Sequence, residues 1–439
     1  MSSDWIETSL GKFIDFKNGR SSPERSDDAS IPVYGSNGII GYSEESNAPD
    51  NCLIIGRVGS YCGSVYHSYS QCWVTDNAIL GLPKHEGESE FWYFLLLKLD
   101  LNNYRSGSGQ PLLNQATLNS ISIRIPELSE DRASIGKRLM MFDNKIELNR
   151  QINQTLEQIA QAVFKSWFVD FEPVKAKIEA KQNGQDPERA AMRAISGKTD
   201  EQLDALSLVQ RQQLTATAAL FTDELEGSEL GEIPKGWNIK EVQDLAKTIK
   251  GKSYKSSELV ESNTALVTLK SFNRGGGYRL DGLKEYTGKY KPEQEVFAGD
   301  LIIAYTDVTQ AADVIGKPAM VISDSHYEHL VISLDVAVVR PEVDAHKYFL
   351  YGVAKTAVFQ QHTRSYTTGT TVLHLGKSAV PEYKFAKPSE DLLETYSCIV
   401  KSMFDLINER VEENNNLESL RDTVLPKLIS GELEVKDVA

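Results

Sequence analysis

The feature that most constrains the fold of this chain is a long internal repeat. Residues of the first half recur in the same order in the second half, at offsets that grow from 232 to 261 residues. Self-similarity over such a long period indicates one structural plan made twice. We therefore expect two domains of one fold within the 439 residues. The matched residues, first copy then second, are Trp5 and Trp237, Gly19 and Gly251, Arg20 and Lys252, Leu53 and Leu301, Ser108 and Thr368, Leu113 and Leu373, Leu156 and Leu417.

Each copy ends in a stretch with the seam pattern of a coiled coil. Apolar residues recur there at alternating spacings of four and three, which is a heptad repeat. Asn153 and Asn414 hold equivalent seam positions, where a polar residue lowers stability and can fix register. The predicted seam residues are Leu139, Ile146, Asn153, Leu156 and Val163 in the first copy, and Val400, Ile407, Asn414, Leu417 and Val424 in the second.

The length of these helices indicates that they pack on each other. A helix of about 35 to 40 residues is roughly 50 to 60 Å long, which is too long for one small domain to cover. A partner helix of similar length is needed, and the chain supplies one. The alternative interpretation is that each stretch is an ordinary core helix of its own domain.

The segments before each long helix have a mixed α/β pattern. Short apolar runs at 52–55, 78–80, 301–304 and 336–339 are separated by Gly, Ser, Asn and Asp, as strands and turns would be. We also expect one helix in each copy, over residues 91–99 and 346–359. The expected fold is α/β (mixed α+β), with a globular domain over 1–129, a spacer helix over 130–170, a linker with short helices over 171–230, a second globular domain over 231–389, and a second spacer helix with a tail over 390–439.

The charge is acidic overall but unevenly placed. The chain has 47 Lys and Arg against 62 Asp and Glu, a net charge of −15, which excludes a uniformly basic nucleic-acid coat protein. By segment the balance is −6 over 1–129, 0 over 130–170, +2 over 231–389 and −7 over 390–439. The longest apolar run, 91–97, is far short of the roughly 20 residues of a membrane span. We expect a cytoplasmic protein whose four Cys residues stay reduced.

Five stretches together resemble the specificity subunits of type I restriction-modification systems. They cover residues 31–40, 53–60, 165–173, 229–237 and 425–433, among them Lys-Ser-Trp-Phe-Val-Asp-Phe-Glu-Pro and Leu-Pro-Lys-Leu-Ile-Ser-Gly-Glu-Leu. The resemblance implies two target-recognition domains that each read one half of a split double-stranded DNA site, held apart by two antiparallel spacer helices. It also implies that two methyltransferase subunits and two restriction-translocase subunits assemble on the chain. S-adenosylmethionine, ATP and Mg are then expected on those partners, and no cofactor or metal in this chain.

Two non-identical readers predict an asymmetric target in two parts. Half-sites read on one face of a duplex lie about one helical turn, or 34 to 36 Å, apart. A change in the length of either long helix should then change the number of unread base pairs between the half-sites. The base sequence itself stays open, because it depends on loop conformation and on DNA shape as well as on side-chain type.

Candidate DNA contacts gather in turns and loops of both copies. Arg, Gln and Asn can make paired contacts with base edges, and hydroxyl groups suit phosphate oxygens. The alternatives are ordinary surface turns and solvated lysines. The candidates are Arg57, Ser60, Tyr61, Tyr104, Arg105, Ser108, Gln110 and Asn114 in the first copy, and Lys250, Lys252, Tyr254, Asn273, Arg274, Tyr278, Arg279, Tyr305, Arg364, Tyr366, Thr368 and Thr370 in the second, where the segment 362–371 is expected to be a loop.

The sequence holds no recognisable catalytic motif. Three Gly-Lys-Thr/Ser tripeptides, at 197–199, 251–253 and 376–378, lack the first glycine of a phosphate-binding loop. Neither the Cys spacing nor the isolated His326 and His329 pair is typical of zinc ligands. We therefore expect a non-catalytic recognition and assembly subunit. The alternatives are a stand-alone DNA methyltransferase or nuclease, and a coiled-coil scaffold that never touches DNA.

Overall fold

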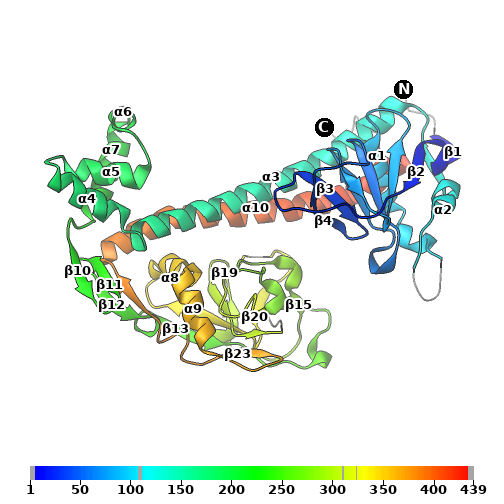
Figure 1. Ribbon diagram of the computed structural model, residues 1–439. Helices are drawn as coiled ribbons and strands as arrows, with labels where there is room; N and C mark the ends of the chain where they lie inside the picture. Colours follow the sequence, from blue (N-terminus) through cyan, green and yellow to red (C-terminus); the bar gives the residue numbers. More distant parts are fainter. Residues whose placement is uncertain (1–4, 107–110, 309–310, 323, 434–439) are drawn as a thin grey trace. The chain divides into compact units, whose positions relative to one another are not determined.

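The computed structural model describes residues 5–106, 111–308, 311–322 and 324–433. The chain divides into two compact units (Figure 1). The first unit consists of residues 1–148 and 413–439, and the second of residues 149–412. The mixed α/β class predicted from the sequence is confirmed, since each unit contains both helices and several small sheets.

The first unit is built on an antiparallel four-stranded sheet of order β2-β8-β5-β6. Its strands are β2 (Ile14–Asn18), β8 (Ala78–Pro83), β5 (Cys52–Gly56) and β6 (Val65–Ser68). A second sheet joins β4 (Gly38–Ser43), β3 (Ile31–Gly35) and β7 (Trp73–Val74), with β3 and β7 parallel. The strands β1 (Trp5–Ser9) and β9 (Ser122–Pro126) pair separately, and the helices are α1 (Ser89–Lys98) and α2 (Gln115–Ser120).

The second unit repeats these sheets. Its main sheet has the order β13-β21-β17-β19, with β13 (Ala246–Lys250), β21 (Val336–Pro341), β17 (Leu301–Ala304) and β19 (Pro318–Met320). The next contains β15 (Lys284–Glu285), β14 (Thr264–Val267), β20 (His329–Ile332) and β16 (Glu295–Val296), with β14 and β20 parallel. The pair β12 (Asn238–Glu241) and β24 (Lys384–Lys387) corresponds to β1 and β9, and a small sheet joins β18 (Thr306–Asp307), β23 (Leu373–Leu375) and β22 (Thr367–Thr368).

The strand orders confirm the internal repeat. The matched Leu-Ile-Ile runs are β5 and β17, and each is flanked in its sheet by the corresponding strand, β8 or β21. Both copies also contain the same parallel pair, β3 with β7 and β14 with β20. The buried faces of these strands form the cores of the two units, in which Leu53, Ile55, Leu301 and Ile303 are almost fully buried.

Two long helices each contribute to both units. They are α3 (Ser129–Phe168) and α10 (Glu390–Ser430), and they lie side by side within each unit (Figure 1). In the first unit Arg421 Nη1 donates to Asp143 Oδ1 at 2.6 Å. In the second, Arg410 Nη1 donates to Asn149 Oδ1 at 3.2 Å and Asn153 Nδ2 to the Ile407 carbonyl at 3.4 Å. Within the second unit, later positions of α3 face earlier positions of α10, so the helices are antiparallel there.

The predicted seam residues lie on the inner faces of the two helices. Leu139 and Ile146 are buried in the first unit, and Val400 and Ile407 in the second. Leu156 and Val163 are partly buried against the second core, and Val424 against the first. Asn414 is buried at 7% exposed. The remaining two, Asn153 and Leu417, are half-buried.

Two expectations about helices were incomplete. The predicted helix 346–359 is two helices, α8 (His346–Lys355) and α9 (Ala357–Ser365). Thr356 separates them because its backbone is extended and its hydroxyl accepts a hydrogen bond from Phe359 N, which makes it an N-cap. The segment 171–230 is more than a linker, since it contains α4 (Glu172–Gln182), α5 (Pro187–Ser196), α6 (Asp200–Asp204) and α7 (Leu208–Ala219), of which the last three enclose a small core. The hairpin β10 (Leu225–Ser228) and β11 (Gly231–Pro234) follows.

Further findings concern the cysteines and the membrane. Cys52, Cys62 and Cys72 are buried free cysteines, and Cys398 is an exposed one. Cys52 Sγ and Cys72 Sγ lie 3.6 Å apart. None of the helices in the described part of the chain combines the length and apolar character that crossing a bilayer requires.

Candidate nucleic-acid interface

In the first unit, three segments meet where β5 ends. Arg57 N donates to the Asn77 carbonyl at 2.9 Å, and Leu113 N donates to the Arg57 carbonyl at 3.0 Å. Ser106 and Leu112 exchange two backbone hydrogen bonds of 2.9 and 3.0 Å. The structure therefore brings together the two loops that the sequence proposed separately, around residues 57–61 and 104–114. We call this meeting point, residues 57–58, 106 and 112–113, the first platform.

Several predicted contact residues are exposed beside the first platform. Tyr61 is 56% exposed and Tyr104 38%, and Ser60 and Arg105 are also exposed. The turn η2 (Gly59–Tyr61) leads to Gly63, where an added Cβ would lie 2.7 Å from Asn102 N in the turn η3 (Leu101–Tyr104). Because the two turns pack this closely, their exposed side chains share one surface. Aromatic rings, hydroxyls and a guanidinium group suit contacts with bases and phosphates.

Other predicted residues of the first copy have different surroundings. Asn114 caps α2, since its Oδ1 accepts hydrogen bonds from Thr117 N at 2.9 Å and Thr117 Oγ1 at 3.2 Å. That oxygen is therefore engaged in helix capping, a role that the sequence interpretation missed. Arg57 is half-buried, with Nη1 donating to the Asp76 carbonyl at 3.4 Å. Ser108 and Gln110 lie outside the described residues.

The second unit has the same platform where β17 ends. Tyr305 N donates to the Asp335 carbonyl at 2.7 Å, and Leu375 N donates to the Tyr305 carbonyl at 2.9 Å. Thr306 and Thr368 both pair with His374, as Val58 and Ser106 both pair with Leu112. These residues, 305–306, 368 and 374–375, form the second platform. The sequence match of Ser108 with Thr368 and of Leu113 with Leu373 was wrong by two residues, because backbone pairing aligns Ser106 with Thr368 and Leu113 with Leu375.

The side chains of the second platform differ from those of the first. Tyr305, which replaces Arg57, is only 2% exposed, and burial raises the pKa of its hydroxyl. Its ring therefore offers no surface to DNA, contrary to the sequence prediction. The ring contacts Lys250, whose ammonium lies 4.6 Å from the ring centroid. Thr368 and Thr370 are exposed.

The predicted loop 362–371 begins as a helix. Arg364 lies in the last turn of α9, and its Nη2 donates to the Ala311 carbonyl at 3.1 Å. Tyr366 is 36% exposed, and its ring lies tilted against that of His362, with the ring centroids 4.7 Å apart. Burial and the nearby Arg364 lower the pKa of Lys317. The end of α9 is thus a place where cations gather, which favours an anionic partner such as a phosphate.

The basic stretch before β17 contains side chains of several kinds. Arg274 is 85% exposed. Arg274 Nε lies 3.9 Å from Asp313 Oδ2, and Arg279 is paired with Asp281, whose Oδ1 accepts from Arg279 Nε at 2.9 Å. Burial raises the pKa of Tyr278, whose ring packs against the core, so this residue is also a poor DNA contact. Asn273 Nδ2 donates to the Tyr278 carbonyl at 3.4 Å and holds the turn together. Tyr254 is half-buried against the small apolar cluster of Leu266, Tyr286 and Val331. The centroid of its ring lies 5.7 Å from the Lys284 ammonium.

A glycine followed by a cation recurs at matched places in the two copies. Gly19 and Gly251 lie against backbone, because an added Cβ would be 1.9 Å from Thr75 O and 2.2 Å from Ile332 O respectively. The next residues, Arg20 and Lys252, each form a parallel bridge, with Thr75 and Ser333. Lys252 was a predicted contact and Arg20 was not, although the repeat itself gave the signal. Arg20 is exposed and joins the candidates.

Among the described residues, no group of three or more His, Cys, Asp or Glu side chains is placed to hold a metal ion. The candidate interface therefore consists of exposed aromatic, hydroxyl and cationic side chains on two similar platforms.

Comparisons with known proteins agree on one family. The family model described as "Type I restriction modification DNA specificity domain" matches residues 2–158. The "Type I restriction enzyme HindI specificity subunit" of Haemophilus influenzae is 31% identical over 383 residues, which cover 82% of this chain and 79% of that protein. The "Type I restriction enzyme MjaIX specificity subunit" of Methanocaldococcus jannaschii is 24% identical, over 81% of this chain and 72% of that protein.

A solved structure shares the fold. It is the crystal structure of a type I restriction-modification system S subunit from M. genitalium, with a TM-score of 0.56 at 14% identity. The match covers 97% of this chain and 96% of that chain. At this identity the likeness concerns the fold alone.

Proposed function

This chain belongs to the specificity subunits of type I restriction-modification systems, and we propose that its two repeats read the two halves of a split DNA sequence. The observation that carries the proposal is that one backbone platform occurs twice with different side chains. Arg57 and Ser106 stand where the second copy has Tyr305 and Thr368. Two readers that share a frame and differ in side chains would recognise two different short sequences, and hence an asymmetric site.

The proposal assigns the DNA contacts to a subset of the candidate residues in each unit. In the first unit it rests on Ser60, Tyr61, Tyr104 and Arg105, together with Arg20. In the second it rests on the half-buried Lys252 and on exposed residues near β13 and the end of α9: Lys250, Arg274, Arg364, Tyr366, Thr368 and Thr370. Phosphate contacts fix the position of a protein on DNA, and base contacts specify the sequence.

We further propose that the chain is a non-catalytic assembly subunit. Two methyltransferase subunits and, in the full complex, two restriction-translocase subunits would bind to it and carry S-adenosylmethionine, ATP and Mg. The net charge of −15 supports this division. Since phosphate binding depends on cations, partner subunits would supply much of the attraction to the DNA backbone, and this chain the selectivity. A protein with this task works where the cell keeps its DNA, which is the cytoplasm of a bacterium or archaeon.

The decisive experiment uses the purified chain with and without its methyltransferase subunit. Incubated with genomic DNA and S-adenosylmethionine, the chain alone should transfer no methyl groups. The combined subunits should methylate one asymmetric two-part sequence, identified by methylome sequencing. Methylation or cleavage by the chain alone would favour the stand-alone enzyme, and an assembled complex without sequence preference would favour the coiled-coil scaffold.

A further inference from the structure

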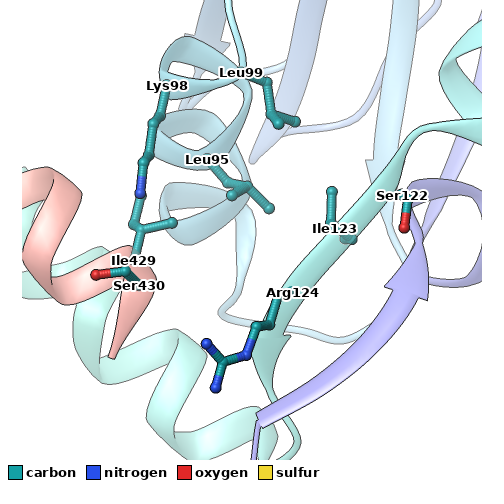
Figure 2. Close-up of a pocket in the computed structure, with 8 residues that line it drawn as sticks. All are labelled: Leu95, Lys98, Leu99, Ser122, Ile123, Arg124, Ile429 and Ser430. Atoms are coloured by element: carbon teal, nitrogen blue, oxygen red, sulfur yellow. The ribbon is translucent and has the colours of Figure 1, made fainter. Parts of the chain in front are cut away.

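The first unit contains a cavity that the reading of DNA does not use. It has a volume of about 290 Å³ and lies between the end of α1, the strand β9 and the end of α10 (Figure 2). This volume is at the lower end of the range for ligand pockets, about 300 to 1,000 Å³, and has room for one or two side chains. The residues that line it are Leu95, Lys98, Leu99, Ser122, Ile123, Arg124, Ile429 and Ser430.

The second unit fills the corresponding place with aromatic rings. Strand pairing aligns Ile123 with Phe385, because their cross-strand partners Thr8 and Lys240 are related by the repeat offset of 232. The offset between the long helices, which relates Leu156 to Leu417, aligns Ile429 with Phe168.

In the second unit the ring of Phe349 lies 5.1 Å from that of Phe168 and 5.5 Å from that of Phe385. Three phenylalanine rings therefore pack together at that place. The first unit has two isoleucines at the aligned positions, and a cavity remains beside them.

The rim of the cavity is cationic. Arg124 is exposed, with its guanidinium carbon 5.7 Å from the centroid of the Trp5 ring. Lys98 Nζ donates to the Pro426 carbonyl at 3.1 Å, at the side of the cavity formed by α10. Figure 2 shows both side chains beside Ile429. In the second unit the residue aligned with Arg124 is Ala386, so this cation of the rim has no counterpart there.

An apolar floor with a cationic rim selects a particular kind of occupant. Leu95, Leu99, Ile123 and Ile429 suit a large apolar side chain, whose burial stabilises a complex. The cations suit a carboxylate beside that side chain. DNA has phosphates but no apolar side chain of this size, whereas the cores of protein interfaces are apolar.

We propose that this cavity receives a segment of the methyltransferase subunit in which an aromatic or large aliphatic residue stands next to an acidic one. This inference rests on the proposed function, in which the methyltransferase subunit binds this chain and modifies the DNA that the chain recognises. The cavity would anchor the partner as a single deep contact of the kind that dominates many interfaces.

The test introduces into the first unit the residues that the second unit has at two aligned positions. Ile429→Phe fills the cavity and Arg124→Ala removes the cation, each giving the residue found at the aligned position. Isothermal titration of the methyltransferase subunit into the full chain should show affinity falling about tenfold for Ile429→Phe and about three- to tenfold for Arg124→Ala. Lys12→Ala, which removes an exposed cation in the same unit, is the control and should bind like the wild type.

The possible outcomes separate the inference from the proposed function. Wild-type affinity in the exposed-site variant Arg124→Ala, or in a folded Ile429→Phe with an unchanged melting temperature, would overturn the inference. Unchanged assembly with weakened DNA binding at saturating methyltransferase would assign the cavity to DNA and also overturn it. Failure of the wild-type chain itself to bind the methyltransferase subunit would instead contradict the proposed function.

Discussion

Arg132 Nη2 donates to Glu88 Oε1 at 2.7 Å, and the two side chains are 2% and 0% exposed. Trp92 Nε1 donates to the other oxygen of Glu88 at 2.9 Å, and Arg132 Nη1 donates to the Pro126 carbonyl at 2.6 Å. This buried network joins the first turn of α3 to the beginning of α1. The long helix is thus fixed to the first reader by a charged pair that has no access to water.

Removing one partner of this pair should destabilise the first unit strongly. Arg132→Met leaves Glu88 buried without its cation, which costs about 3 to 5 kcal/mol of unfolding free energy. Calorimetry of the full chain should show a lower melting temperature for the transition of the first unit. Asp15→Ala breaks an exposed ion pair with Lys84, 3.3 Å apart, and should cost less than about 1 kcal/mol. Equal losses in the two variants would contradict the buried role of the pair.

The matched glycines predict matched defects. Because a Cβ at Gly19 or Gly251 would meet backbone oxygen at 1.9 or 2.2 Å, Gly19→Ala and Gly251→Ala should each shift the cation that follows and cost about 1 to 3 kcal/mol. Gly19→Ala should weaken discrimination in one half-site only, and Gly251→Ala in the other, as measured by competition with single-base variants of the target. Gly227→Ala, which has open space around its Cβ, is the control. Loss in both half-sites from one substitution would count against two independent readers.

The parts of the fold that could be predicted are those that repeat. The heptad spacing indicated both long helices because apolar residues at 3.5-residue intervals favour one structure only. The Leu-Ile-Ile runs indicated buried strands because each is bounded by turn residues. Duplication supplied a check, since each element had to occur twice.

The parts that could not be predicted depend on tertiary packing. Tyr278 and Tyr305 are of the same residue type as the exposed Tyr61, and only the direction of each side chain from its backbone separates them. Asn114 could serve as a base contact or as a helix cap, and the position of α2 decides between the two. The break at Thr356 falls inside an apolar helical pattern that continues on both sides of it.

Substitution of two arginines would test whether each unit contacts DNA bases. Arg105 is exposed beside the first platform and Arg364 at the end of α9. If each reads a base, Arg105→Ala and Arg364→Ala should relax preference at one position, by about 1 to 3 kcal/mol, rather than weaken binding to all sequences. Gel-shift titration of the assembled complex at fixed salt, against targets varied one base pair at a time, measures this. A uniform loss would indicate phosphate contacts, and unchanged affinity would remove these residues from the interface.

The two long helices are expected to set the length of the unread DNA. A four-residue insertion in α3, matched by one in α10, adds about 6 Å at 1.5 Å per residue, which corresponds to roughly two base pairs at 3.4 Å each. Methylome sequencing of cells that carry the insertion variant should show the same half-sites with a longer gap. Substitution of four exposed residues at the same place, without insertion, is the control. An unchanged gap would contradict the spacer role.

His67 predicts an acid sensitivity of the first unit. Its ring lies 4.4 Å from that of Tyr69 and 6.0 Å from that of Tyr93, and burial lowers its pKa to about 4. The unfolded chain binds a proton at this residue near pH 6.5, so between about pH 6.5 and 4 the unfolded state binds more protons than the folded one. Stability should therefore fall as the pH is lowered through this window, by at most about 3 kcal/mol from this residue. His67→Phe should flatten the pH dependence of the first unit's melting temperature, whereas His326→Gln, at an exposed side chain in the second unit, should leave it unchanged. The same slope in wild type and His67→Phe would show that His67 titrates alike in both states.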